Sequence, residues 1–270
     1  DFGAANDGDG DRNMILGKKF FVTPSDSLAI LTDNYKLIPA YKNGIYGVAK
    51  SAATSTAVGR VAKTLNIGYY EVPTGWKYFC NLMDSNRITF CGEESFGTGS
   101  SHIREKDGIW AVLFWLSIIA ATGKSVQEIT EEHWKKYGRS YYMRNDYDGL
   151  DTEVANKLMA DLESRLPNLT GKTFGAYTVS EAKPFIYNDP VDGSSTKNGL
   201  IVYFTDNSRI VYRLSGTGTN GATLRVYLER YETKDLNEDV ETMLESLADV
   251  SRQIGEITER TGKVKADVLT

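Results

Sequence analysis

The stretch GIYGVAKSAATSTAVGRVAKTLNIGYYEVP, residues 44–73, decides the fold. Gly44–Ala49 predicts a strand. Thr54–Asn66 repeats apolar residues at helical spacing, after Ser and Thr residues that can cap a helix. Gly68–Val72 predicts a second strand, which ends at the following proline. Because a strand, a helix and a strand in succession form a parallel βαβ unit, we expect an α/β domain with a mostly parallel sheet and helices on both faces.

The residues that follow continue this alternation. We expect a helix over Trp76–Ser85, a strand over Arg87–Gly92 and a closing helix over Ser125–Tyr137. Between them, Ile109–Gly123 is the longest apolar run, IWAVLFWLSIIAATG, and we expect a helix that is buried on most sides. The run is shorter than the roughly 20 residues that cross a bilayer, so it predicts no membrane span.

The second half of the chain has a different pattern. Gly138–Asp151 is polar and aromatic with turn residues, and we interpret it as a link between domains. An amphipathic helix, Thr152–Leu166, follows it, and a long helix, about Leu236–Thr261, ends the chain. Strands are expected between these helices, at residues 173–179, 183–189, 199–206, 209–216 and 222–232, with hairpin turns at 189–193 and 205–208. Strands bracketed by helices favour an α+β domain with an antiparallel sheet and helices on one face.

The domain organisation expected from these patterns has three parts. Residues Asn13–Val22 look like the end of a domain that began earlier, so we expect 1–24 to be such an end, 25–140 the α/β domain and 141–270 the α+β domain. The chain does not begin with Met and carries its densest charge cluster near its start. We therefore expect it to be a fragment of a longer protein.

Composition excludes several classes of protein. The 270 residues are 41% hydrophobic and 25% charged, as in ordinary globular proteins of about two domains. The net charge of −5 argues against nucleic-acid binding by the surface as a whole. Cys80 and Cys91 are too few for a disulfide framework and fit small buried side chains in a reducing compartment, so we expect a cytoplasmic protein.

Asp7-Gly8-Asp9-Gly10-Asp11-Arg12 is a candidate metal loop. The glycines let the loop curl until its three carboxylates converge, and converging carboxylates repel one another unless a cation lies among them. Oxygen ligands suit Mg²⁺ or Ca²⁺. An EF-hand loop needs Gly at position six and Glu at position twelve, where this chain has Arg12 and Lys18. A solvated acidic turn is the alternative interpretation.

Three further loops follow predicted strands, where ligands of open α/β sheets bind. Residues 72–77, VPTGWK, form a Thr-Gly turn between a strand and a helix. Residues 91–108, CGEESFGTGSSHIREKDG, concentrate carboxylates, hydroxyls and bases. Residues 213–225, RLSGTGTNGATLR, expose backbone N–H groups and hydroxyls with an arginine on each side, a composition that suits phosphate. This last loop lacks the Gly-Lys-Ser/Thr ending of a nucleotide-binding P-loop.

Each loop also has a structural interpretation. The Thr-Gly turn could be only a turn, the Gly-Thr-rich stretch a flexible hairpin, and Glu93 and Glu94 solvated acids. His102 and His133 fit structural hydrogen bonding better than catalysis. Taken together, however, a cation site, a loop that can bind sugar hydroxyls and a phosphate cradle indicate a phosphosugar pocket.

The segments DGDGDRNMILG, VPTGWK, CGEESFGTGSSHIREKDG and RLSGTGTNGATLR resemble the successive active-site loops of the α-D-phosphohexomutases. The long third loop resembles the form found in eukaryotic-type phosphoglucomutases and the parafusin-like relatives. The resemblance covers essentially the whole chain in the right order. The family has four domains around a central cleft, so the resemblance implies that this chain is the end of the second domain, the third and the fourth.

The resemblance implies an isomerase of carbohydrate metabolism that interconverts glucose 1-phosphate and glucose 6-phosphate. A phosphoserine gives its phosphoryl group to the sugar, glucose 1,6-bisphosphate forms as the intermediate, and the other phosphate returns to the serine. The implied Mg²⁺ ligands are Asp7, Asp9 and Asp11, and the implied catalytic residues are Arg12 and Lys106. The implied substrate-binding residues are Thr74, Gly75, Glu93 and Ser95 for the sugar, and Arg213, Ser215, Thr217, Gly218, Thr219 and Arg225 for the phosphate that is not transferred.

One departure from the family is large. The Thr-Ala-Ser-His-Asn-Pro type loop that carries the nucleophilic serine is absent, and the only Ser-His pair, Ser101-His102, belongs to the third loop. We therefore expect the partners of this chain to be the missing N-terminal domains of the same protein and a phosphosugar, and we expect this chain alone to be inactive. A non-catalytic, parafusin-like protein that acts through binding or phosphorylation is the alternative.

Overall fold

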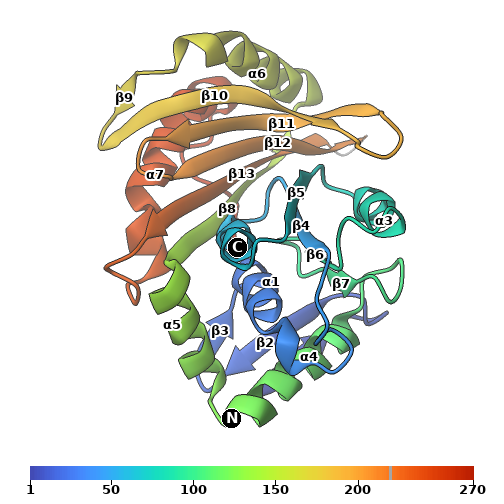
Figure 1. Ribbon diagram of the computed structural model, residues 1–270. Coiled ribbons are helices and arrows are strands. Elements are labelled where there is room, and N and C mark those ends of the chain that lie inside the picture. The colour runs from blue at the N-terminus through green and yellow to red at the C-terminus, as the bar shows by residue number, and fades with distance from the viewer. Residues whose placement is uncertain (219–220) are drawn as a thin grey trace. The chain divides into compact units, whose positions relative to one another are not determined.

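The computed structural model describes residues 1–218 and 221–270 (Figure 1). The chain divides into two compact units, one of residues 1–139 with 187–196 and the other of residues 140–186 with 197–270. Each unit has a hydrophobic core of its own. The predicted fold class is confirmed: an α/β unit with a mixed sheet is followed by a unit with an antiparallel sheet and helices.

The first unit begins with a small antiparallel sheet. Its strands are β1 (Gly3–Asn6), β2 (Asn13–Gly17) and β3 (Phe20–Val22), in the order β1-β2-β3. The strand and turn predicted at residues 13–22 are therefore the hairpin of β2 and β3. Strand β1 was not predicted. Because Asn6 pairs with Asn13, the candidate metal loop is the connection between two paired strands.

Helix α1 (Pro24–Asp33) was also missed, although the sequence carries its signals. The Thr23 hydroxyl accepts a hydrogen bond from the Asp26 N–H at 3.1 Å, and Pro24 occupies the first helical position. Both are typical of helix starts. Leu28, Ile30 and other apolar residues of α1 are buried in the core. A short 3₁₀ turn, Tyr35–Leu37, follows the helix.

The main sheet of the first unit has four strands in the order β5-β4-β6-β7. Its strands are β4 (Gly47–Ser51), β5 (Gly68–Val72), β6 (Phe90–Gly92) and β7 (Thr98–Ser100). β4 pairs in parallel with β5 and β6, as predicted, and β7 returns antiparallel to β6. The predicted strands at 44–49 and 87–92 pair over shorter or shifted ranges, and β7 lies inside a segment predicted as loop.

The helices of this unit are α2 (Ala57–Leu65), α3 (Trp76–Asp84), α4 (Gly108–Thr122) and α5 (Val126–Tyr137). All four were predicted. None of the helices among the described residues is long and apolar enough to cross a membrane by itself; α4 and α5, bent by 86° at their junction, pass that test of length and composition only as a pair.

The prediction that the apolar helix is buried on most sides is wrong. In α4, Trp115 and Ile118 are fully buried, but Ile109, Leu113 and Leu116 are 59%, 58% and 41% exposed. These three residues are spaced four and three apart, so they form one apolar stripe along the helix. The composition of the helix could not reveal this, because it is apolar on every side.

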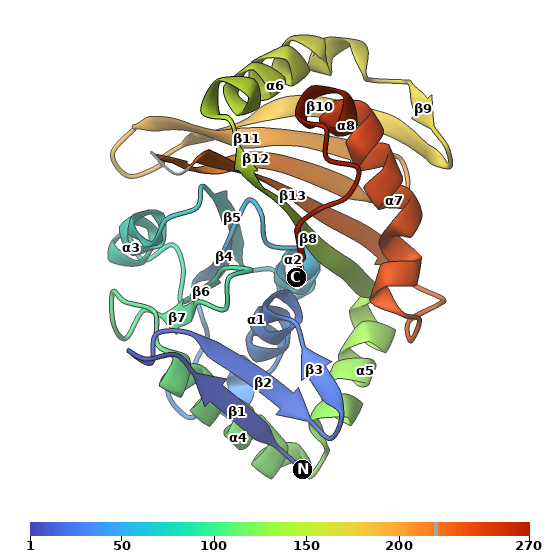
Figure 2. The same ribbon diagram turned by 180° about the vertical axis from the view of Figure 1, so that it is seen from behind.

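The second unit is built on a seven-stranded sheet with the order β14-β8-β13-β12-β11-β10-β9, seen from the two sides in Figures 1 and 2. Its strands are β8 (Arg139–Leu150), β9 (Thr173–Phe174), β10 (Tyr177–Asn188), β11 (Ser195–Phe204), β12 (Arg209–Gly218), β13 (Gly221–Glu232) and β14 (Val268–Leu269). Its helices are α6 (Thr152–Arg165), α7 (Val240–Gly255) and α8 (Ile257–Thr261), with a 3₁₀ turn at Leu166–Asn168. The hairpin turns predicted between β10 and β11 and between β11 and β12 are present.

Three sequence-based assignments in this unit are wrong. Residues 138–151 are not a link, because strand β8 occupies nearly all of them. The strands predicted at 173–179 and 183–189 are largely one strand, β10, preceded by a turn at Gly175 with φ 56°. The long final helix breaks at Glu256, whose φ of 49° lies in the left-handed region, and so becomes α7 and α8.

Candidate functional site

The three acids of the loop between β1 and β2 converge. Asp7, Asp9 and Asp11 each place a carboxylate oxygen within 4.8 Å of the others, and Asp7 and Asp9 are exposed to solvent. The Arg12 N–H donates to Asp7 Oδ1 at 3.1 Å, and this bond is the main reason why the pKa of Asp7 is lowered. The Arg12 guanidinium lies 3.9 Å from both Asp7 and Asp11. The loop is thus a cluster of carboxylate oxygens suited to a divalent cation.

Backbone contacts fix this loop against the third loop. Asn13, which is buried, bonds through its N–H to the Phe96 carbonyl at 3.0 Å, and its side chain donates to the same carbonyl at 3.2 Å. The Gly108 N–H, at the start of α4, donates to the Gly10 carbonyl at 3.1 Å. A Cβ on Gly108 would lie 2.5 Å from the Arg12 carbonyl oxygen, so only glycine permits this approach.

Glu93 and Lys106 meet beside the metal loop. Lys106 Nζ lies 3.6 Å from Glu93 Oε2 and 3.7 Å from Asp11 Oδ2. Glu93 is only 4% exposed, and burial raises its pKa, an effect that the Lys106 charge partly offsets. The Ser95 hydroxyl lies 3.5 Å from Glu93 Oε2. A buried carboxylate, an ammonium and a hydroxyl thus face one small region, a set that can bind sugar hydroxyls and move a proton.

The Thr-Gly turn joins the same region. Gly75, the residue before α3, has φ 138°, and its backbone hydrogen-bonds to Glu93. Trp76, the first residue of α3, lies under the Lys106 ammonium, which is 5.7 Å from the centre of the indole ring. Thr74 directly precedes this turn and is half-buried. The first three loops identified in the sequence therefore lie close together within one unit.

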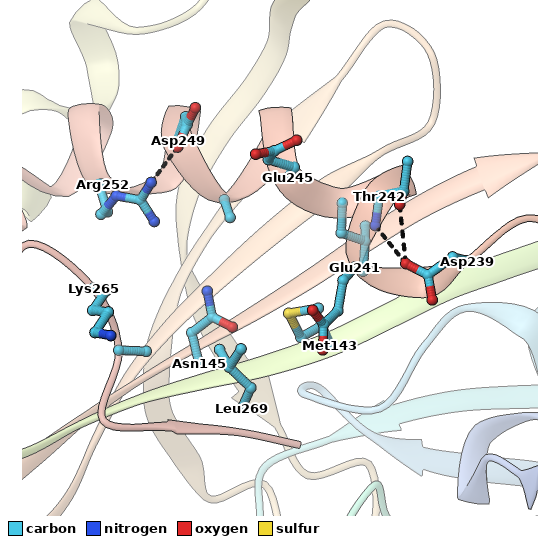
Figure 3. Close-up of a pocket in the computed structure, with 13 residues that line it drawn as sticks. Met143, Asn145, Asp239, Glu241, Thr242, Glu245, Asp249, Arg252, Lys265 and Leu269 are labelled. Atoms are coloured by element: carbon cyan, nitrogen blue, oxygen red, sulfur yellow. Dashed lines mark hydrogen bonds and ion pairs between the residues drawn. The ribbon is translucent and has the colours of Figure 1, made fainter.

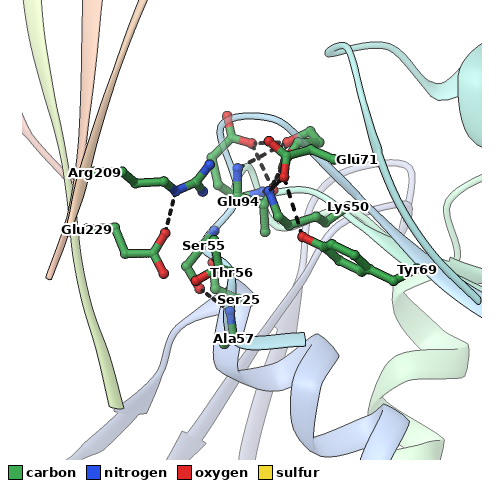
Figure 4. A network of polar contacts seen from close by, with 12 residues as sticks. Ser25, Lys50, Ser55, Thr56, Ala57, Tyr69, Glu71, Glu94, Arg209 and Glu229 are labelled. Atoms are coloured by element: carbon green, nitrogen blue, oxygen red, sulfur yellow. Dashed lines mark hydrogen bonds and ion pairs between the residues drawn. The ribbon is translucent and has the colours of Figure 1, made fainter. Parts of the chain in front are cut away.

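The interpretation of Glu93 and Glu94 as solvated acids is wrong, because Glu94 too is only 8% exposed. Glu94 accepts a hydrogen bond from the Ser51 hydroxyl at 2.9 Å, and its N–H donates to Thr54 Oγ1 at 2.8 Å. Figure 4 labels Glu94 together with the fully buried Lys50, which pairs with Glu71 at 2.9 Å. The tip of the third loop is therefore anchored to the end of β4.

The two histidines differ, because His102 makes hydrogen bonds through both ring nitrogens whereas His133 Nδ1 is buried without a hydrogen-bond partner. His102 Nδ1 lies 2.5 Å from the Ser100 hydroxyl and its Nε2 lies 2.9 Å from Asp107, which caps α4. His133 is buried in the core of the first unit, and burial lowers its pKa to about 4.

The fourth loop lies on the second unit, at the end of the β12–β13 hairpin. Arg213 and Arg225 are directly opposed across the ladder, and Ser215 opposes Thr223 beside a bulge. Two like charges at facing positions repel each other, so this place favours an anion between them. Arg225 Nε lies 3.8 Å from Asp146 Oδ2 but has no hydrogen-bond partner. Thr219 and the side chain of Thr217 lie outside the described residues, and Gly218 pairs with Gly221 in the ladder.

Two family models match the chain, one after the other. Residues 24–137 match the phosphoglucomutase/phosphomannomutase alpha/beta/alpha domain III, and residues 139–267 match the phosphoglucomutase-1 C-terminal domain. The chain belongs to the phosphoglucomutase/phosphomannomutase family. The elements from α1 to α8 therefore fall within the matches to this family's third and C-terminal domains, whereas β1, β2 and β3 precede both matches and β14 follows them.

Relatives within the family are similar over the whole of this chain. It is 54% identical to a phosphoglucomutase of Rhizobium radiobacter and 53% identical to phosphoglucomutase-1 of Homo sapiens, covering 100% of this chain and 50% of each relative. The crystal structure of the Paramecium exocytosis-sensitive phosphoprotein pp63/parafusin (phosphoglucomutase), in an open form, superposes with a TM-score of 0.92 at 47% identity, over 100% of this chain and 47% of that one. The chain thus spans about half the length of the curated relatives it matches.

Three residues beside the candidate site escaped the sequence analysis. Gly97 lies against the Lys106 side chain, Trp76 lies under its ammonium, and Asp146 faces Arg225. Gly97 and Trp76 stand inside the quoted loops and could have been noted there. Asp146 was hidden because its strand had been interpreted as a link.

Proposed function

We propose that this chain supplies the metal-binding, sugar-binding and phosphate-binding groups of a phosphoglucomutase. The whole protein would interconvert glucose 1-phosphate and glucose 6-phosphate through a phosphoserine and glucose 1,6-bisphosphate. The observation that carries the proposal is the position of Lys106, whose ammonium lies within 4 Å of both Asp11 and Glu93. One ammonium group thereby links the acidic loop to the buried carboxylate, an arrangement that would position a phosphoryl group beside a sugar hydroxyl.

The acidic loop fits Mg²⁺ in its chemistry, since its three carboxylates converge and two are open to solvent. Asp7, Asp9 and Asp11 would hold the ion, which neutralises charge on the transferring phosphoryl group when it is bound. Arg12 lies beside these acids and would bind the same phosphoryl group. The proposed metal ligands and Arg12 all stand in residues 1–24, which we assign to the end of the family's second domain.

The residues around Glu93 would hold the sugar. Glu93 and Ser95 would bind its hydroxyls, with Thr74 and Gly75 lining the same region. Lys106 would donate to the reacting oxygen and stabilise the charge that develops there. These residues belong to the α/β domain, which we assign to residues 25–140.

The opposed arginines of the β12–β13 hairpin would bind the phosphate that is not transferred. Arg213 and Arg225 can each form charge-assisted hydrogen bonds to phosphate oxygens. Ser215 would add a hydroxyl, and Thr217, Gly218 and Thr219 would complete the loop. We assign this hairpin to the fourth domain, residues 141–270. A clamp that recognises phosphate alone accepts either orientation of the sugar.

The nucleophilic serine would come from a part of the protein outside these residues, since the chain contains no Thr-Ala-Ser-His-Asn-Pro type loop. The proposed partners are accordingly those N-terminal domains and a phosphosugar, and the proposed compartment is the cytoplasm. The parafusin-like, non-catalytic alternative is not favoured, because a protein that only binds has no need of three converging carboxylates.

The proposal is tested with the full-length protein and two variants. Asp9→Asn should lower the mutase rate about 10³-fold or more, because the ion supports every phosphoryl step. Arg225→Ala should raise KM for both glucose phosphates, since loss of a charge-assisted contact costs about 1.5–3 kcal/mol. Glu259→Gln, an exposed change on α8, is the matched control. If the wild-type protein showed no turnover, the proposed mutase function would be wrong. If Arg225→Ala raised KM for only one of the two glucose phosphates, the proposed shared phosphate clamp would be wrong.

A further inference from the structure

A cavity of about 420 Å³ lies in the second unit, away from the β12–β13 hairpin. Strand β8, helix α7 and the segment at Lys265–Leu269 form its walls (Figure 3). Successive residues of a strand point to opposite faces, so Met143 and Asn145 of β8 lie on the same face, and both line the cavity. Its size falls within the range of sites that bind small molecules.

Asn145 gives this cavity a chemical preference. The side chain is 2% exposed, and its Oδ1 is buried without a hydrogen-bond partner. Buried polar groups are nearly always paired, and an unpaired one costs stability. A carboxamide offers one acceptor and two donors side by side, which matches the C=O and N–H of a peptide bond. The unpaired oxygen therefore favours a ligand that offers an N–H donor, as the amide group of a peptide bond does.

Apart from the ion pair of Arg252 with Asp249, the charged groups at the rim are separated by sign. Glu241 and Glu245 extend from one stretch of α7, whereas Lys265 and Arg252 stand at the other end of the cavity (Figure 3). Among the described residues, the side chains of Glu241, Glu245 and Lys265 form no ion pair or hydrogen bond. Arg252 is already paired with Asp249. The cavity thus has an acidic end, a basic end and a carboxamide between them.

We propose that this cavity binds a short peptide-like zwitterion. Its ammonium group would lie by Glu241 and Glu245, its carboxylate by Lys265, and its amide bond against Asn145. The apolar side chains of Met143 and Leu269 would contact its aliphatic part. The proposal concerns a place separate from the phosphate hairpin and does not rest on mutase activity.

The test uses the 270-residue chain labelled for NMR, with the dipeptide Ala-Ala as the probe. Saturable shifts of the Asn145 side-chain amide signals are expected, with a Kd of about 1 mM or below. N-acetyl-Ala-Ala, which lacks the ammonium, and Ala-Ala-amide, which lacks the carboxylate, should each bind at least about tenfold more weakly, since each loses a charge-assisted contact. Equal binding of all three compounds, or no saturable shift of the Asn145 signals, would overturn the proposal.

Three variants separate binding from folding. Asn145→Leu should abolish binding while leaving the melting temperature equal or higher, because it removes a buried unpaired amide. Glu245→Gln and Lys265→Gln change exposed residues, so they should fold normally and weaken binding of Ala-Ala at least about tenfold. Glu259→Gln, an exposed change on α8 outside the cavity, is the matched control and should leave Kd unchanged. Unchanged affinity in Glu245→Gln and Lys265→Gln would reject the site even if Asn145→Leu failed to fold.

Discussion

Gly97 leaves room for the Lys106 side chain. A Cβ at this position would be 2.9 Å from Lys106 Cδ and 3.2 Å from Glu93 Oε2, closer than side chains ordinarily approach. The flexible lysine would move aside, so Gly97→Ala should fold normally. In the full-length protein, however, its kcat should fall about 10²-fold, because a displacement of about 1 Å at a reacting group has that effect.

The control for this prediction is Gly3→Ala, whose Cβ would meet Leu16 Cβ at 3.4 Å, an ordinary contact. Steady-state kinetics and thermal melting of both variants are the measurements. A Gly97→Ala protein with unchanged kcat would mean that the position of Lys106 does not matter for turnover.

Two buried titratable residues act on stability in opposite directions. Burial raises the pKa of Asp26 to about 6, and burial lowers the pKa of His133 to about 4. Between pH 4 and 6 the folded state holds the Asp26 proton that the unfolded state releases, so this residue makes stability fall as pH rises. Over the same range the unfolded state binds a His133 proton that the folded state excludes, so this residue makes stability rise.

Replacing either residue should reveal the pH dependence of stability that the other contributes. Asp26→Asn should show a free energy of unfolding that rises by up to about 3 kcal/mol between pH 4 and 6.5, from the pKa difference of His133. His133→Gln should show the opposite slope between pH 4 and 6. Urea unfolding of the 270-residue chain at several pH values measures both. Parallel pH profiles of the two variants would contradict the assignment.

At the scale of elements, helix α4 has apolar side chains that are buried on one side and exposed to solvent on the other. Leu113→Gln should change the free energy of unfolding of the 270-residue chain by less than about 0.5 kcal/mol, because the side chain is 58% exposed. Trp115→Ala, two residues on, should cost about 3–5 kcal/mol, since that side chain is fully buried. Chemical denaturation compares the two, and a large loss in Leu113→Gln would mean that the exposed stripe is covered within this chain.

The sequence predicted helices and strands well where the spacing of apolar residues agreed with capping and turn residues. Helix α5 was predicted over Ser125–Tyr137, and the structure shows that Ser125 caps it in a capping box with Glu128. Strand β8 was missed because its polar and aromatic residues resemble a linker, and only pairing with β13 and β14 makes it a strand. The break at Glu256 follows Gly255, a residue type that often marks the end of a helix, and the sequence analysis did not use this signal.

The candidate site was predictable in part. The convergence of Asp7, Asp9 and Asp11 follows from alternating glycines in a short connection. The meeting of Lys106 with Glu93 and Asp11 depends on how β7 folds back on β6, a contact of tertiary structure that no local pattern encodes. The cavity at Asn145 could not be predicted for the same reason. It forms only when β8 has paired in its register and the last residues of the chain have folded against it.

At the scale of the whole molecule, two hydrophobic cores predict that the 270 residues fold without further domains. Folding should nevertheless not confer activity. With Mg²⁺ and glucose 1,6-bisphosphate present, the purified chain should show no interconversion of glucose phosphates, because the proposed phosphoryl carrier is a serine that it lacks. A coupled assay with the full-length protein as positive control measures this. Sustained turnover by the chain alone would direct attention to Ser95, Ser101 or Ser215 as the phosphorylated residue.

The opposed pair Arg213 and Arg225 makes the choice of buffer an experimental variable. Sulfate or inorganic phosphate in a storage solution would relieve the repulsion between the two guanidinium groups, and any ligand that binds only the folded state raises the melting temperature. The same anion would then compete with a phosphosugar for the hairpin. Protein kept in phosphate should therefore look more heat-stable and bind substrate more weakly than protein kept in Tris-chloride, although its sequence and fold are unchanged.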